Sequence, residues 1–218
     1  MRDQLALVLR EEAEWIGSYV LLAPDEETEG HMADMDAIQS AVKKCRLCRL
    51  SETRKNTVFG QGPHDAAIMF VGEAPGARED ETGQVFIGSA GNLLTDIIEK
   101  GMGLKRSDVY IANILKCRPP DNRDPLPDEV KICMEYLKAQ IRLISPRLII
   151  TLGQVASQSL LDTKTPISAL RGRFAKYSGI DVMPTYHPSY LLQNPSKKRD
   201  VWEDIKKVMY YLNMPIPG

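Results

Sequence analysis

Apolar runs of strand length constrain the fold of this chain more than any other feature. Residues 67–71 are apolar without interruption and end at Gly72, and residues 109–114 and 148–152 form two similar runs. A strand that is covered on both faces has such a run, because neither row of its side chains meets water. A weaker fourth strand is predicted over residues 181–186. The sequence therefore predicts a sheet that is buried on both sides.

Helical patterns separate the predicted strands. An apolar stripe at helical spacing covers residues 93–98, Asp128 is placed to cap a helix that ends at Pro146, and further helices are expected over residues 153–161 and 201–212. Alternating strands and helices are typical of an α/β domain with a parallel sheet, whose ligands bind at the carboxyl ends of the strands. A chain of 218 residues suffices for one such domain.

The first part of the chain differs from the rest in charge. Residues 1–36 contain ten acidic and two basic side chains, so residues 37–218 carry a net charge of +7 although the whole chain carries −1. A helix is predicted over residues 3–20, followed by an acidic run. We therefore expect residues 1–30 to form a helical extension with an acidic linker, and residues 31–218 to form the main domain. A positive domain is compatible with contact to phosphates.

The sequence shows neither a secretory signal nor a membrane span, because its N-terminus is polar and its apolar runs are short. We therefore expect a cytoplasmic protein with no membrane partner, and a monomer.

Four cysteines are the candidate metal ligands. Cys45 and Cys48 form a C-x-x-C pair after a helix that is predicted over residues 33–44, and Cys117 and Cys133 follow far along the chain. In a reducing compartment disulfides are rare, which leaves metal ligation or simple burial. The polar, arginine-rich surroundings of the first three cysteines favour a metal. Four thiolates suit an iron–sulfur cluster or a zinc ion, and the spacing does not choose between them.

Three side chains stand in loops at the predicted carboxyl ends of strands. Phe86 follows the first strand and can stack on a base or pack in the core. Asn113 closes the second strand, where its amide can pair with a pyrimidine edge or satisfy a turn. His187 follows the fourth strand and is held extended by Pro188. The loop that begins at Gly72 lacks the glycine patterns of nucleotide-binding loops, which disfavours a nucleotide-binding Rossmann domain.

Taken together, four segments resemble the family 4 uracil-DNA glycosylases. They are Gly72-Glu73-Ala74-Pro75-Gly76, the stretch from Glu79-Asp80 through Gly91, Asn113-Ile114-Leu115-Lys116-Cys117-Arg118-Pro119-Pro120, and His187-Pro188-Ser189-Tyr190-Leu191-Leu192. The segments occur in the family's order together with its cysteine arrangement, and the resemblance covers residues 40–212. It implies a three-layer α/β/α domain with a central four-stranded parallel sheet. It also implies an enzyme of base excision repair that flips uracil out of DNA and hydrolyses its N-glycosidic bond.

The resemblance further implies a structural iron–sulfur (4Fe-4S) cluster. Its ligands are expected to be Cys45, Cys48, Cys117 and Cys133. Such a cluster would join the segment before the first strand to the loop and helix after the second strand.

By the same resemblance, three side chains have roles toward the flipped base. Phe86 is expected to stack on uracil, Asn113 to read its polar edge, and His187 to donate a hydrogen bond to O2 as negative charge develops there. The backbone at Glu73 and Ala74 is expected to line the pocket.

The sequence departs from the best-known uracil-DNA glycosylases at Ala74, where those enzymes have an Asp that activates water. Asn122 matches a position that the family is thought to use for orienting water, and Glu73 and Glu79 are alternatives. A sister group that bonds covalently to the abasic site has Gln at the Ala74 position and a His in the loop after the second strand. The loop over residues 117–127 contains no His, so we predict turnover by a monofunctional enzyme.

Contact with uracil-containing DNA is expected from a wedge residue and from basic side chains. Leu191 is the expected wedge, which fills the gap that the flipped base leaves in the stack. The basic candidates are Arg46, Arg49, Arg54, Lys55, Lys197, Lys198 and Arg199. The sequence is also compatible with a contact to a sliding clamp or a polymerase. Two other functions fit the residues: a module that binds uracil-containing or damaged DNA without cutting it, and an α/β hydrolase that acts on free nucleosides.

Overall fold

The computed structural model describes residues 34–216 of the chain, and its centre is a five-stranded sheet in the order β2-β1-β3-β5-β4. Its strands are β1 (Ile68–Gly72), β2 (Tyr110–Asn113), β3 (Leu148–Leu152), β4 (Ala175–Tyr177) and β5 (Ile180–Thr185). The first four in spatial order run parallel, which confirms the predicted four-stranded parallel sheet. β4 adds an antiparallel edge strand.

This fifth strand is absent from the sequence prediction. β4 is joined to β5 by the turn Ser178-Gly179, in which both residues have a positive φ, 46° and 83°. Two residues that end in glycine are a typical hairpin turn, because glycine adopts this conformation without strain. The turn was therefore detectable, but the three residues of β4 are too few to show a periodic pattern.

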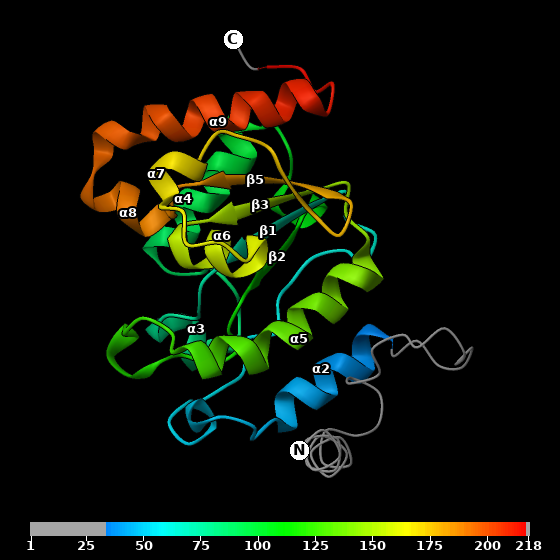
Figure 1. Cartoon of the computed structure of the whole chain (residues 1–218), viewed down its shortest axis with the longest axis vertical. Helices are drawn as coiled ribbons and strands as arrows, with labels where there is room; N and C mark the ends of the chain where they lie inside the picture. Colours follow the sequence, from blue (N-terminus) through cyan, green and yellow to red (C-terminus); the bar gives the residue numbers. More distant parts are fainter. Residues whose placement is uncertain (1–33, 217–218) are drawn as a thin grey trace.

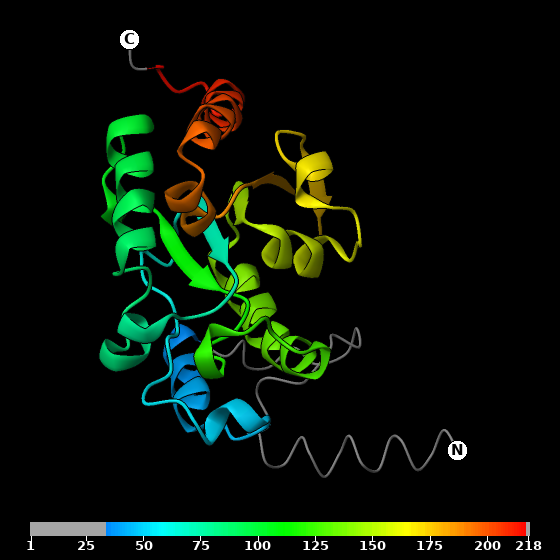
Figure 2. The same ribbon diagram turned by 90° about the vertical axis from the view of Figure 1, so that its left-hand side faces the viewer.

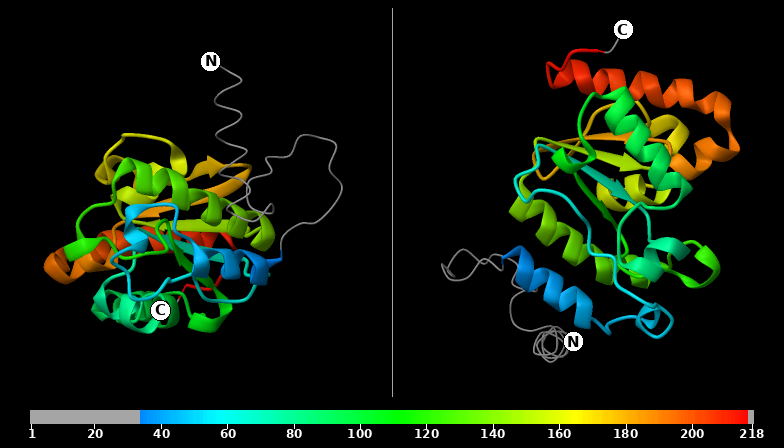
Figure 3. Two further views of the ribbon diagram at one scale, coloured as in Figure 1. Left: turned by 90° about the horizontal axis from the view of Figure 1, so that it is seen from below. Right: turned by 180° about the vertical axis from the view of Figure 1, so that it is seen from behind.

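Helices cover both faces of the sheet and complete three layers (Figures 1 and 2). One face packs against α2 (Met35–Lys44), α5 (Pro127–Ile144) and α6 (Gln154–Leu161). The other packs against α4 (Ser89–Asp96) with its π-helical continuation η2 (Ile97–Gly101), α8 (Pro188–Gln193) and α9 (Lys198–Tyr211). α2 and α5 lie side by side at one end of the molecule (Figure 3).

The strands supply both cores by simple alternation. In β1, Met69 and Val71 belong to the core under α2 and α5, whereas Ile68 and Phe70 belong to the core under α4 and α9. Successive side chains of a strand point to opposite faces, so an uninterrupted apolar run fills both layers at once. The buried runs read from the sequence therefore correspond to β1, β2 and β3.

The shorter elements lie mostly in the connections. They are η1 (Arg49–Ser51), α3 (Ala77–Thr82), η3 (Arg106–Asp108), η4 (Pro120–Asn122), α7 (Ile167–Leu170) and η5 (Pro195–Lys197). The extension predicted over residues 1–30 lies outside the described residues. No helix within residues 34–216 is long and apolar enough to cross a membrane.

The predicted cap of α5 is wrong. The N-cap residue is Leu126, and Asp128 lies in the first turn, where it pairs with Arg49 at 3.0 Å. The carboxylate of Glu129 accepts the Leu126 N–H at 2.9 Å and so satisfies the helix start. Asp and Glu are both favourable in a first turn, so composition alone does not identify the capping group.

Candidate active site

The loops that carry the predicted site residues meet at one edge of the sheet. Gly72 at the end of β1 pairs with Asn113 at the end of β2, and Leu152 at the end of β3 pairs with Thr185 at the end of β5. The carboxyl ends of parallel strands share one edge, and ligands of α/β domains bind there.

Gly72 is the point at which two of the predicted side chains converge. A Cβ on this residue would lie 2.4 Å from Oδ1 of Asn113 and 2.6 Å from Cζ of Phe86. Both side chains therefore approach the bare backbone of Gly72 and lie next to each other. Glycine is required here because of this close approach.

The loop that presents Phe86 is held in an unusual backbone conformation. Phe86 has a φ of +50°, in the left-handed region that large side chains rarely adopt. The loop is held by Glu79, whose Oε1 accepts the N–H groups of Ile87 and Gly88, each at 2.9 Å. The Phe86 carbonyl lies so close to Gly91 that a Cβ there would be 1.9 Å from its oxygen. These contacts give Glu79 a structural role in positioning the aromatic ring.

Phe86 and His187 lie side by side although a hundred residues separate them in sequence. Their ring centroids are 5.7 Å apart and their planes are tilted by 36°. Gly153, at the end of β3, lies under the histidine, since a Cβ there would be 2.9 Å from Cβ of His187. The structure thus brings Phe86, Asn113 and His187 to one place.

Asn113 holds an acceptor without a partner. Its side chain is 1% exposed, and among the described residues Oδ1 is the one buried side-chain nitrogen or oxygen atom that has no hydrogen bond. A buried amide oxygen without a donor is costly, and such an atom calls for an explanation. A ligand with an N–H group at this edge of the sheet would satisfy it.

His187 is a neutral donor. Its Nδ1 accepts the backbone N–H of Ser189 at 3.1 Å and lies 2.7 Å from Oγ of the same residue. Because Nδ1 accepts, the proton of the neutral ring is on Nε2. Burial lowers the pKa of His187 from 6.5 to about 4, which keeps the ring neutral near pH 7.

Glu73 and Ala74 follow β1 directly. The Glu73 carbonyl accepts the N–H of Leu115 at 2.9 Å, which ties the loop after β1 to the segment after β2. Burial raises the pKa of the Glu73 carboxyl, and the nearby charge of Asp124 raises it further. The half-buried Ala74 packs against the core under α2 and α5.

Asn122 lies in the exposed loop between β2 and α5. It has a φ of +54°, and its Oδ1 accepts the Arg118 Nε–H at 2.8 Å. The loop is anchored by Arg123, whose guanidinium forms two hydrogen bonds of 2.9 and 2.6 Å with the fully buried Glu129. Among the described residues, no hydrogen bond joins Asn122 to Phe86, Asn113 or His187.

The four cysteines are free thiols that gather beside α5. Cys117 and Cys133 are buried in the core under α2 and α5, and the half-buried Cys45 and Cys48 pack against it. Burial raises the pKa of Cys133 to about 12, and charges on Cys117 and Cys45 add to this effect. Within residues 34–216 no three His, Cys, Asp or Glu side chains are grouped tightly enough to hold a single metal ion.

Two of these sulfurs nevertheless accept hydrogen bonds. Arg54 donates from Nη1 to Sγ of Cys117 at 2.9 Å and from Nη2 to the Cys45 carbonyl at 2.6 Å. The backbone N–H of Lys116 donates to Sγ of Cys133 at 3.2 Å. Hydrogen bonds and positive charge favour thiolates over thiols, and thiolates are the form that binds metals.

Comparison with known proteins identifies the family of the chain. The family model of the uracil DNA glycosylase superfamily matches residues 59–206, about two thirds of the chain. The chain belongs to the uracil DNA glycosylase superfamily. This match spans β1 to α9 and includes Cys117 and Cys133, whereas Cys45 and Cys48 precede it.

Within this superfamily the chain is similar to proteins named Type-4 uracil-DNA glycosylase. That of Thermotoga maritima is 45% identical over 182 residues, which cover 82% of this chain and 94% of the relative. That of Saccharolobus solfataricus is 45% identical over 185 residues, which cover 81% and 86%. That of Archaeoglobus fulgidus is 42% identical over 185 residues, which cover 81% and 92%. The predicted family 4 membership is therefore confirmed.

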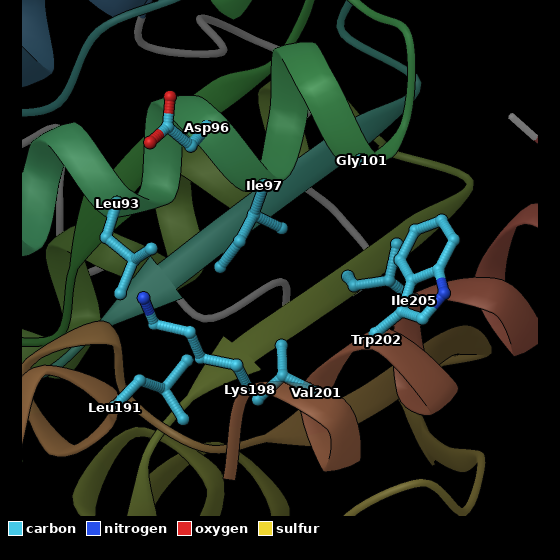
Figure 4. Close-up of a pocket in the computed structure, with 9 residues that line it drawn as sticks. All are labelled: Leu93, Asp96, Ile97, Gly101, Leu191, Lys198, Val201, Trp202 and Ile205. Carbon is cyan, nitrogen blue, oxygen red and sulfur yellow. The ribbon is translucent and has the colours of Figure 1, made fainter. Parts of the chain in front are cut away.

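The wedge role of Leu191 stays a prediction, and the structure places this side chain in the core. Leu191 is 1% exposed and, together with Leu93 and Trp202, lines a cavity of about 190 Å³ between α4 and α9 (Figure 4). To enter a base stack from this position, its side chain would have to leave the core. The neighbours Tyr190 and Leu192 are 39% and 45% exposed.

The predicted basic patch is largely engaged in protein contacts. Lys55 pairs with Glu81 at 3.0 Å, Lys197 pairs with Asp200 at 3.1 Å, and Arg54 binds the cysteine site. Surface ion pairs are weak, so these lysines can exchange a carboxylate for a phosphate. Sequence reasoning missed the supporting roles of Gly72, Gly153 and Glu79.

Proposed function

We propose that the protein is a monofunctional uracil-DNA glycosylase, which flips uracil out of DNA and hydrolyses the N-glycosidic bond to leave an abasic site. The observation that carries this proposal is the unpartnered Oδ1 of Asn113 beside Phe86 and His187. The relatives named Type-4 uracil-DNA glycosylase support the same activity.

Recognition of uracil follows from the chemistry of the Asn113 amide. Uracil has an N–H at position 3 and an oxygen at position 4, whereas cytosine has a bare nitrogen and an amino group there. Oδ1 of Asn113 needs a donor, which the N3–H of uracil supplies, while its Nδ2 can donate to O4. Cytosine would leave this buried oxygen unpaired, which disfavours its binding. Phe86 supplies an aromatic face on which the extruded base stacks.

His187 assists the bond cleavage. As the N-glycosidic bond breaks, the sugar becomes cationic and negative charge develops on uracil O2. The Nε2–H of a neutral His187 donates to this oxygen, and the hydrogen bond strengthens as the charge develops. The donor is already oriented, because Ser189 fixes the tautomer. The positively charged sugar is stabilised by nearby DNA phosphates.

The residues that act on the attacking water are assigned to the loops after β1 and β2. We assign its orientation to Asn122, and we assign the acceptance of its proton to Glu73. Support for Glu73 is its place directly after β1 and its partly buried carboxyl, whose pKa is raised by burial and by the charge of Asp124. Glu79 is not assigned, because its carboxylate binds the backbone of the Phe86 loop.

We further propose that Cys45, Cys48, Cys117 and Cys133 hold a structural 4Fe-4S cluster. Support comes from the gathering of four free thiols and from the donors Arg54 and Lys116 that face their sulfurs. A cluster holds its four thiolates farther apart than a single ion does, so it is compatible with the lack of a single-ion site within residues 34–216. When bound, the cluster ties the chain before β1 to α5 and deprotonates its ligands.

DNA contact is proposed for α8 and its surroundings. Tyr190 and Leu192 are exposed there, and Tyr190 packs against Tyr186 with centroids 5.0 Å apart. Since α8 begins directly after His187, an exposed side chain of α8 can occupy the gap left by the flipped base. We propose Leu192 as the wedge in place of Leu191. We also propose that the protein acts as a cytoplasmic monomer.

The activity is tested with uracil-bearing oligonucleotides, single- and double-stranded, followed by alkaline cleavage of abasic sites. We expect strand scission at the uracil position and none at cytosine. Binding without scission over a range of salt concentrations would instead identify a non-catalytic binding module. Release of uracil from deoxyuridine but not from DNA would identify a nucleoside hydrolase. A brown colour and iron in the purified protein test the cluster, because a zinc protein is colourless.

A further inference from the structure

Lys116 is a buried cation that neither the uracil chemistry nor the ligation of the cluster explains. It lies between Asn113 and Cys117, is 1% exposed, and is among the largest fully buried side chains of residues 34–216. Lysine is almost never buried to this extent unless its charge is paired.

The ammonium group binds two neutral oxygens. Its Nζ donates to the backbone carbonyl of Asn113 at 2.8 Å and to Oε1 of Gln140 on α5 at 2.6 Å. Gln140 is itself fixed, since its Nε2 donates to the Phe59 carbonyl and to Oη of Tyr110, each at 3.0 Å. The end of β2, which presents Asn113, is thus bound to α5 through Lys116.

No carboxylate compensates this charge among the described residues, where Lys116 takes part in no ion pair. The titratable groups that face it are Cys117 on its own segment and Cys133 on α5. Its backbone N–H also donates to Sγ of Cys133. Lys116 therefore bridges two segments that each carry a cysteine, because Cys117 follows it on the segment after β2 and Cys133 lies on α5, to which its Nζ is bound through Gln140.

We propose that Lys116 is a positioning residue that couples the cysteine-held cluster to the uracil-reading end of β2. Its Nζ fixes the carbonyl of Asn113 to Gln140 on α5, and the same bridge holds the segment of Cys117 against the helix of Cys133. The inference rests on the proposed function and on the proposed cluster. It predicts that removing this one bridge both weakens cluster retention and loosens the recognition of uracil.

The test compares Lys116→Met with Lys138→Met, a matched loss of a lysine on α5 whose side chain is partly exposed and paired with Glu135. Two quantities are measured on each full-length protein: the rate at which a chelator bleaches the cluster, and the inhibition constant of free uracil in the cluster-loaded fraction. For Lys116→Met we expect roughly 10- to 100-fold faster bleaching, since partners that support metal ligands contribute on this scale. We also expect weaker inhibition by uracil. Lys138→Met is expected to match the wild type in both.

Lys116→Arg keeps the positive charge and is expected to slow the bleaching again, which a loss of packing alone would not do. Values for Lys116→Met equal to those of Lys138→Met in either measurement would overturn the coupling. If Lys116→Met does not yield folded protein, Gln140→Leu decides, because it removes the acceptor that holds the ammonium. Unchanged inhibition by uracil in that variant would overturn the proposal. A wild-type protein without iron or without uracil inhibition would instead contradict the proposed function itself.

Discussion

At the scale of single residues, the site depends on atoms that the protein leaves without partners or holds in one protonation state. Oδ1 of Asn113 lacks a donor, and Nε2 of His187 carries a proton because Nδ1 accepts from Ser189. In the proposed function, the first atom accepts a hydrogen bond from the base and the second donates one to it. Both are oriented before any ligand binds, which is the condition for electrostatic stabilisation of a transition state.

His187→Ala is expected to lower the single-turnover rate of uracil release by on the order of 100-fold or more, while DNA affinity changes little, because its hydrogen bond strengthens only as the bond breaks. Ser189→Ala is the matched control, since it keeps the backbone N–H that fixes the tautomer. Single-turnover kinetics and DNA binding are measured on both variants. Equal losses of rate and affinity in His187→Ala would contradict the assigned role.

The neutral state of His187 also predicts a pH dependence of stability. The pKa of His187 is 6.5 in the unfolded chain, whereas burial lowers this pKa to about 4 in the folded protein. Between these values the unfolded state binds more protons, so the free energy of unfolding decreases as the pH falls through this window. Denaturant titrations across the window should show a smaller decrease for His187→Gln than for the wild type. An identical decrease in both proteins would mean that His187 is not buried in its neutral form.

At the scale of elements, α8 shows how a short helix divides its residues between core and surface. Leu191 faces the core beside α4 and α9, whereas Tyr190 and Leu192 on either side of it are exposed. Leu192→Ala is expected to slow excision from double-stranded DNA much more than from single-stranded DNA, because only a duplex has a partner strand and a stack to hold open. Its melting temperature should stay near that of the wild type.

Leu191→Ala is the matched variant on the same helix. It removes a side chain from the core and is expected to cost about 2–5 kcal/mol of stability. Excision rates of the folded protein on the two substrates should change in parallel. A selective loss on duplex DNA in Leu191→Ala, but not in Leu192→Ala, would restore the wedge to Leu191.

Some of these elements could be predicted from the sequence and others could not. The buried strands were predictable because an apolar run reports burial on both faces directly, and the loops were predictable from the family resemblance. The burial of Leu191 was not, since a motif of six residues does not reveal which of two adjacent leucines faces the core. The close approach at Gly72 depends on Asn113, which lies far along the chain. The support of the Phe86 loop by Glu79 is local in sequence, but it depends on the irregular path of this loop. Pattern and spacing carry no signal for them.

At the scale of the whole molecule, the parallel sheet brings three loops together at one edge. The cysteines lie on the segments that flank these loops. Cys45 and Cys48 precede β1, Cys117 follows β2, and Cys133 lies on α5. Removal of iron by a chelator is therefore expected to lower the melting temperature of the folded protein, because bound metal stabilises only the state that holds it. Calorimetry before and after chelation checks this. An unchanged melting temperature would show that the thiols alone hold these segments.

The proposed function requires that Phe86, Asn113 and His187 form one pocket that selects uracil through the unpartnered oxygen of Asn113. Single-turnover excision by the wild type and by Asn113→Ala, on one single-stranded oligonucleotide with a single uracil, tests it most directly. We expect alkali-labile cleavage at the uracil by the wild type and a loss on the order of 100-fold or more in the variant, as for a misplaced recognition group. Equal rates of cleavage by the two proteins would contradict the account.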